Sequence, residues 1–155
     1  MEPKMRRKDR AISNLEAKKL LREGRYGVLS TTSPDGKPYG VPISYTYRGN
    51  AIYFHGATEG RKITNLQSNN KVSFCVVGRT RLLPSKFATN YESVIVSGRV
   101  LELTGEKKRQ ALIYLLKKYS PAHIEKGLQY IQDIQANAKV FKIAIQTVTG
   151  KARKK

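Results

Sequence analysis

The side chains best suited to chemistry lie within one short stretch of the chain, residues 51–66. Its residue types predict a strand, a glycine-bearing turn and the start of a helix in succession. Arg61 and Lys62 fall in the first turn of that helix, where free backbone N–H groups and the helix dipole favour an anion such as phosphate. Two cations at the positive end of a helix are unfavourable unless an anion compensates them, so the pair indicates a phosphate site. The alternative is a solvated basic turn.

His55, just before this turn, is the second candidate for chemistry. In a strand it would face away from Ile52 and Phe54 and lie beside Tyr53. A histidine in that place can exchange protons near neutral pH, or it can be an ordinary surface side chain. Cys75 lies in an apolar run and is expected to be a small buried side chain rather than a reactive thiol. Two histidines and one cysteine argue against a zinc site.

The chain carries a formal charge of +19, from 30 Lys and Arg against 11 Asp and Glu. Such a charge raises the question of a nucleic-acid partner. The densest cationic clusters, residues 4–10 and 151–155, lie at the two ends, and no helix-turn-helix, zinc-finger or RNA-binding signature accompanies them. We therefore expect no specific nucleic-acid partner. The sequence shows neither a signal peptide nor an apolar run long enough for a membrane span, which predicts a cytoplasmic protein without membrane contact.

A length of 155 residues is typical of one domain and is large enough to bury a hydrophobic core. Helices are expected at residues 13–24, from Gly60 onward, at 104–119 and at 125–135. Ser13 and Glu16 form a capping-box signature for the first helix, and Thr104 would cap the third. Six strands are expected, at residues 26–32, 39–47, 51–55, 72–77, 92–103 and 140–146. Residues 78–90 lack periodicity and are expected to form a functional or interface loop.

Short connections make most of these strands antiparallel neighbours, because a parallel pair needs a longer crossover. We therefore predict an α+β domain whose antiparallel sheet closes into a small barrel, with the helices packed outside it or over its ends. Basic residues 1–12 would form an N-terminal arm, and residues 147–155 a basic C-terminal tail.

Six separated segments of the chain resemble the pyridoxamine 5′-phosphate oxidase-like flavoproteins, and most closely their nitroimidazole-resistance (Nim) branch. The segments are residues 6–10, 26–31, 39–45, 52–55, 91–94 and 149–153. They follow one another in order over almost the whole chain. The resemblance implies that residues 1–155 form a single FMN-binding domain, an antiparallel six-stranded split β-barrel with flanking helices. It also implies a homodimer with FMN at the subunit interface.

The same resemblance assigns FMN-binding roles to particular residues. Arg61 and Lys62 would hold the phosphate. Relatives often have His-Lys at these two positions, and the Arg-Lys pair of this chain keeps or strengthens the anion site. Asn65, one turn further on, would add a polar contact. The residues along the isoalloxazine ring would be Val41, Pro42, Ile43 and Ser44, followed by Phe54, His55 and Gly56. The residues reaching the site from the partner subunit would be Tyr91, Glu92 and Ser93. The alternatives are an ordinary barrel strand at residues 41–45, a salt-bridge role for Glu92 and an interface role for Tyr91.

The activity implied by the resemblance is that of an FMN-dependent oxidoreductase that passes electrons to a small acceptor, of which a nitro-aromatic compound is one candidate. His55 would be its candidate catalytic residue. The sequence has no dinucleotide-binding fingerprint and does not identify the electron donor. Three alternatives stay open: a flavin or haem module without turnover, such as a sensor or carrier; a split barrel for a deazaflavin; and anion or nucleic-acid binding driven by the charge, which predicts steep salt dependence.

Overall fold

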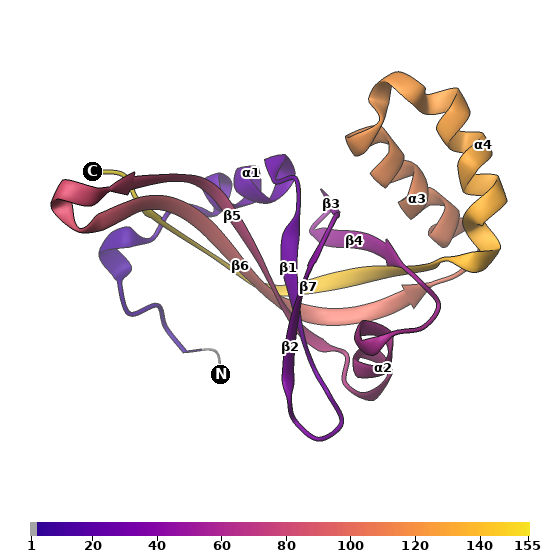
Figure 1. Ribbon diagram of the computed structural model, residues 1–155, viewed down its shortest axis with the longest axis horizontal. Helices are drawn as coiled ribbons and strands as arrows, with labels where there is room; N and C mark the ends of the chain where they lie inside the picture. The colour runs from indigo at the N-terminus through magenta and orange to yellow at the C-terminus, as the bar shows by residue number, and fades with distance from the viewer. Residues whose placement is uncertain (1–2) are drawn as a thin grey trace.

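Seven strands form one antiparallel sheet in the computed structural model, which describes residues 3–155 (Figure 1). They are β1 (Gly27–Thr32), β2 (Pro38–Ile43), β3 (Thr46–Arg48), β4 (Ala51–Gly56), β5 (Lys71–Leu83), β6 (Ala88–Leu103) and β7 (Lys139–Arg153). Their order across the sheet is β2-β1-β5-β6-β7-β4-β3. The hairpins β1–β2, β3–β4 and β5–β6 are antiparallel, as the short connections predicted.

The two edge strands of the sheet are almost continuous in sequence. β2 lies at one end of the strand order and β3 at the other, yet only Ser44 and Tyr45 separate them. The two ends of the sheet must therefore lie close together, although no ladder of hydrogen bonds joins them in the described chain. This is the arrangement of a split barrel. The predicted α+β class is confirmed, but the prediction of six strands was wrong.

The seventh strand arises because the strand predicted at residues 39–47 breaks at Tyr45. The backbone N–H of Tyr45 donates to the Tyr119 hydroxyl at 2.9 Å, and the Lys118 amine donates to the Tyr45 carbonyl at 2.8 Å. Both side chains come from helix α3 (Gly105–Tyr119). The helix thus satisfies the backbone groups that a neighbouring strand would otherwise have engaged.

The other α-helices are α1 (Asn14–Glu23), α2 (Arg61–Ser68) and α4 (Ile124–Ile134), with short 3-10 helices at Lys8–Arg10, Pro84–Lys86, Pro121–His123 and Gln135–Asn137. The predicted cap of α1 is confirmed, because Ser13 Oγ accepts a hydrogen bond from the Glu16 N–H at 3.1 Å. Thr104 stands at the N-cap position of α3, but its side chain makes no capping bond, so that role was wrongly predicted. Within residues 3–155, no helix combines the length and the apolar character needed to cross a lipid bilayer.

Two groups of buried side chains hold these elements together. The larger group fills the barrel, where the Tyr45 ring meets the Phe74 ring edge-on at 4.9 Å between ring centres. The Tyr45 hydroxyl also donates to the Leu21 carbonyl at 2.5 Å, which ties α1 to the barrel. The smaller group attaches α3 and α4 to β7 through Ala111, Leu112, Ile131 and Val140. Figure 1 shows these two helices side by side above β4 and β7.

Residues 78–90 do not form the irregular loop that the sequence predicted. After an irregularity between Val77 and Thr80, β5 pairs with β6 from Thr80 opposite Tyr91 to Leu83 opposite Ala88. The result is a two-stranded ribbon that projects from the sheet (Figure 1). Most side chains near its tip are exposed, so the alternation of apolar and polar residues that reveals a half-buried strand is missing there.

The predicted basic tail, residues 147–155, was also wrong for most of its length. β7 continues to Arg153, which pairs with Tyr91 of β6. The N-terminal arm is likewise attached, since Ala11 forms a β-bridge with Lys151. Residues 1 and 2 of that arm lie outside the described residues. Both ends of the chain therefore meet at the C-terminal part of β7.

Candidate functional site

The N-terminus of α2 has features that favour an anion. Gly60 at its N-cap has φ +131°, a left-handed conformation that glycine adopts without strain. In the described structure no side chain caps this helix and its first turn contains no acidic residue. The free N–H groups of the first turn and the helix dipole therefore favour an anion at this position, although Glu59 precedes the cap in the sequence.

Arg61 and Lys62 extend from this turn toward two different strands. The Arg61 guanidinium carbon lies 4.6 Å from the centre of the Tyr39 ring on β2. The Lys62 amine lies 6.0 Å from the centre of the Phe54 ring on β4. A Cβ atom added to Gly56 would come within 3.0 Å of the Lys62 amine, so glycine leaves room for this lysine. The two cations thus lie at the helix start, one toward β2 and one toward β4, and burial lowers the pKa of Lys62.

Tyr39 was not predicted as a site residue. Its segment carried part of the family resemblance, but a tyrosine on a hairpin strand gives no sign that a distant arginine will stack on it. Only the folded arrangement brings β2 against α2.

Asn65 fixes α2 in place beneath these cations. Its side chain is 1% exposed. The Asn65 amide donates to Thr31 Oγ1 at 2.9 Å, and that hydroxyl donates to the Tyr39 carbonyl at 3.4 Å. The buried amide therefore connects α2 to β1 and β2. A contact between Asn65 and FMN stays a prediction.

His55 lies at the end of β4 on the outer face, as predicted. Ile52 and Phe54 are fully buried, whereas His55 is exposed. Partial burial and the nearby Lys62 charge lower the pKa of His55 below its ordinary value of 6.5. The lowered pKa favours the neutral imidazole, whose lone pair can take up a proton.

We expect the His55 imidazole to titrate with a midpoint below pH 6.5 in an NMR titration. The unfolded chain, whose histidine has the ordinary pKa, then binds more protons below pH 6.5 than the folded chain. This contribution to stability is therefore lost as the pH falls through the folded-state pKa. Replacing Lys62 by methionine should raise the midpoint, and a His123→Gln variant identifies the His55 signal. A midpoint at or above 6.5 would contradict the proposed environment.

The remaining β2 and β4 candidates present different faces to a ligand. Ile43 is 8% exposed and Val41 packs against the barrel core, whereas Pro42 and Ser44 are exposed. Phe54 points into the core and is fully buried. A ligand at this surface would meet the side chains of Pro42 and Ser44 but only the backbone at the inward-facing positions.

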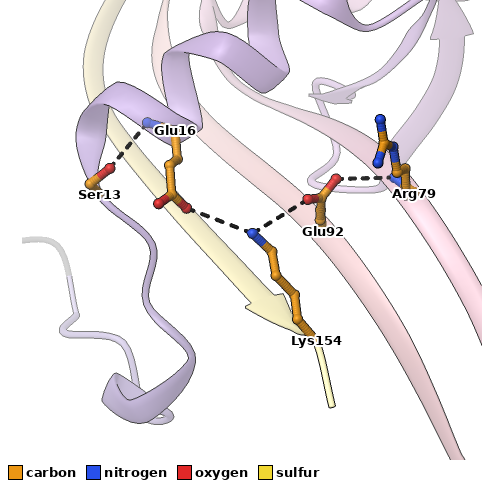
Figure 2. A network of polar contacts seen from close by, with 5 residues as sticks. All are labelled: Ser13, Glu16, Arg79, Glu92 and Lys154. Atoms are coloured by element: carbon orange, nitrogen blue, oxygen red, sulfur yellow. Dashed lines mark hydrogen bonds and ion pairs between the residues drawn. The ribbon is translucent and has the colours of Figure 1, made fainter.

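Tyr91, Glu92 and Ser93 lie in the β5–β6 ribbon, at the opposite end of the molecule from α2 (Figure 1). Figure 2 shows that Glu92 has partners within its own chain: its carboxylate lies 3.6 Å from the Lys154 amine and accepts from the Arg79 N–H at 3.4 Å. Lys154 also lies 4.0 Å from Glu16. Burial acts to raise the pKa of Tyr91, but the nearby cations Arg10 and Lys151 together lower it below its ordinary value. These three residues can approach an α2 site only on another subunit.

The outer face of β1, β5 and β6 carries an apolar row. Strand register aligns Pro42, Val28, Cys75 and Ile95 across β2, β1, β5 and β6. Val28 is 37% and Ile95 48% exposed. Cys75 is half-buried on this outer face, so its predicted place in the core was wrong; burial raises the pKa of its thiol.

Comparison with known proteins agrees with this arrangement. The model of the family described as pyridoxamine 5′-phosphate oxidase matches residues 13–152. An uncharacterized protein of Rhizobium meliloti (strain 1021) is 29% identical over 153 residues, covering 92% of this chain and 94% of that protein.

Two solved structures extend the comparison. A candidate 5-nitroimidazole antibiotic resistance protein from Bacteroides thetaiotaomicron superposes with a TM-score of 0.74 at 25% identity, over 92% of this chain and 86% of the other. An FAD-binding protein from Mesorhizobium loti superposes with a TM-score of 0.68 at 27% identity, over 94% of this chain and 98% of the other. In each case the similarity covers nearly the whole domain.

Proposed function

Because the chain belongs to the pyridoxamine 5′-phosphate oxidase family, we propose that it is an FMN-binding flavoprotein. The observation that carries this proposal is the start of α2, where Arg61 and Lys62 lie in a first turn that, in the described structure, has no side-chain cap and no acidic residue. These features suit a phosphate monoester, which FMN carries at the end of its ribityl chain. The ring would lie along residues 41–44 and the end of β4.

The proposed activity is electron transfer to a small acceptor. FMN, when bound and reduced by an external electron donor, would pass electrons to the acceptor, and the protein would orient the ring and the acceptor. His55 is exposed at the end of β4 and its pKa is lowered, which favours the neutral imidazole that can take up a proton beside the ring. A nitro-aromatic acceptor is supported by the similarity to the candidate 5-nitroimidazole antibiotic resistance protein.

The cofactor proposal is tested by the visible spectrum of the purified protein and by identification of the flavin released on denaturation. FMN is the expected result. Released FAD, the ligand of the Mesorhizobium loti protein, would replace FMN in the proposal. A colourless protein that cannot be reconstituted with either flavin would overturn it.

Turnover is tested separately from the electron donor. The flavin-loaded protein is reduced anaerobically with dithionite and mixed with a nitro-aromatic compound. Reoxidation at a rate well above that of free reduced FMN supports the oxidoreductase. A rate no faster than that of free FMN would instead favour a carrier or sensor.

The proposed flavoprotein is a homodimer. A second copy is the occupant of the apolar row Pro42–Val28–Cys75–Ile95, because this face lies beside the residues proposed to hold the ring. Tyr91, Glu92 and Ser93 are remote from α2 in their own subunit, so only dimerisation would bring them to a flavin (Figure 1).

Replacing Ile95 by lysine is expected to give a monomer, because the amine would be buried at the subunit interface without a partner. Flavin affinity should fall with it, since each site would lose the other subunit's residues. Sedimentation velocity and flavin titration measure the two effects. The matched control is Leu101→Lys, at a position on the same strand that is 52% exposed. A monomeric I95K protein that retained full flavin affinity would contradict the proposed interface site.

A further inference from the structure

A groove bounded by α1, α3 and the β3–β4 hairpin carries a second concentration of positive charge. Its volume is about 900 Å³, and it lies at the beginning of β4, whereas α2 follows the end of that strand. The cations that line it are Lys18, Arg22, Arg48, Lys117 and Lys118. No carboxylate of the described residues lines it. Because these cations come from all three elements that bound the groove, its electrostatic potential favours anions.

Aromatic rings hold the two arginines in position. The Arg48 guanidinium carbon lies 4.4 Å from the centre of the Tyr114 ring, and that of Arg22 lies 5.9 Å from the centre of the Tyr47 ring. Over residues 3–155 neither arginine forms an ion pair with a carboxylate. Their N–H groups are therefore available for the bidentate contacts that guanidinium groups make with phosphate.

The floor of the groove is a fixed part of the fold. The Lys118 amine donates to the carbonyls of Gly24 and Tyr45 at 2.5 and 2.8 Å, which joins α3 to the end of α1 and to the link between β2 and β3. The hairpin that follows Arg48 turns at Gly49 and Asn50, whose φ values of +53° and +62° are typical of a tight two-residue turn between antiparallel strands. Burial lowers the pKa of Lys118 to about 8, and a nearby anion would favour its charged form.

We propose that this groove binds a diphosphate or triphosphate group, carried by a nucleotide or free in solution. Five cations without a carboxylate match a ligand with several negative charges rather than one. The volume lies within the range of about 300–1,000 Å³ that is typical of small-molecule sites. Tyr53 and Tyr114, with ring centres 5.5 Å apart, offer apolar surface to a nucleoside beside the cations. A nucleic-acid strand would instead need a basic track that continues beyond the groove.

Isothermal titration calorimetry tests the proposal on the full chain with excess FMN, at about 150 mM salt to screen non-specific attraction. The ligands are tripolyphosphate, ATP and AMP. We expect tripolyphosphate and ATP to bind at one site per chain, and AMP to bind at least about tenfold more weakly because it offers fewer charge-assisted contacts. Tighter binding of ATP than of tripolyphosphate identifies a nucleotide as the ligand, whereas equal binding identifies the free polyphosphate.

Two double variants distinguish binding at a specific site from non-specific electrostatic attraction to the whole chain. Arg22→Gln with Arg48→Gln should weaken ATP binding at least about tenfold. Arg81→Gln with Arg109→Gln removes two exposed arginines outside the groove and should leave it unchanged. Equal losses in the two double variants, absence of ATP and tripolyphosphate binding, or tighter binding of single-stranded DNA than of ATP would each overturn the proposal. None of these residues belongs to the α2 site, so failure of the flavin proposal would leave this result unaffected.

Discussion

Replacing Arg61 and Lys62 together by alanine is expected to reduce FMN affinity by about 10²–10⁴-fold. Charge-assisted contacts to a phosphate contribute roughly 1.5–3 kcal/mol each, and both are lost. The uncapped N–H groups of α2 remain, so some binding should persist. Flavin fluorescence titration of the apoprotein measures the change.

The matched control removes one arginine and one lysine from α3, Arg109 and Lys107, which lie outside the proposed phosphate site. It should retain FMN affinity at moderate salt. An affinity in the α2 double variant equal to that of the unsubstituted protein would place the phosphate elsewhere. Similar losses in both double variants would show that overall charge, rather than a local site, attracts the cofactor.

The second large effect is expected for stability rather than binding. Phe54 is 0% exposed and its ring stacks on that of Phe141, with 5.1 Å between ring centres. Phe54→Ala should lower the free energy of unfolding by about 3–5 kcal/mol, because it removes a buried aromatic ring and leaves a cavity in the barrel. Denaturant unfolding followed by circular dichroism measures this loss.

Phe87 provides the matched control, since it is 97% exposed at the tip of the β5–β6 ribbon. Phe87→Ala should change stability by less than about 0.5 kcal/mol. The two variants remove the same side chain from opposite environments. A small effect of Phe54→Ala would mean that the barrel interior repacks or is looser than its burial indicates.

The sequence predicted the fold well wherever one face of an element is buried. Residues that favour strands and the adjoining turn signals predicted β1 and β4, alternation predicted the first half of β7, and the capping signature located α1. The prediction from sequence failed where contacts between residues distant in the chain determine the local structure. The strand is interrupted at Tyr45 because Lys118 and Tyr119 of α3 form hydrogen bonds with the Tyr45 backbone. No local sequence pattern predicts a contact between residues so distant in the chain. The β5–β6 ribbon is mostly exposed near its tip and therefore looked like a loop.

The candidate site shows the same division. Arg61, Lys62 and His55 could be selected because their chemistry and local element were visible in the sequence. Tyr39 was missed because its role depends on β2 meeting α2 in space. The five-cation groove was also missed, since its cations come from α1, β3 and α3, and each looks locally like a solvated charge.

The strand order also determines when the chain can fold. β4 forms ladders with β3 and β7, so within residues 3–155 the β3–β4 hairpin is hydrogen-bonded to the other strands only through the final strand of the chain. Until β7 has been synthesised, no ladder can join this hairpin to the sheet of β2, β1, β5 and β6, although Ser44 and Tyr45 link β2 to β3 along the chain. Pairings as remote as Ala51 with Ala144 form slowly, and such intermediates are prone to aggregate. Completion of the sheet therefore requires β7, the last strand to be synthesised, because it pairs with both β6 and β4.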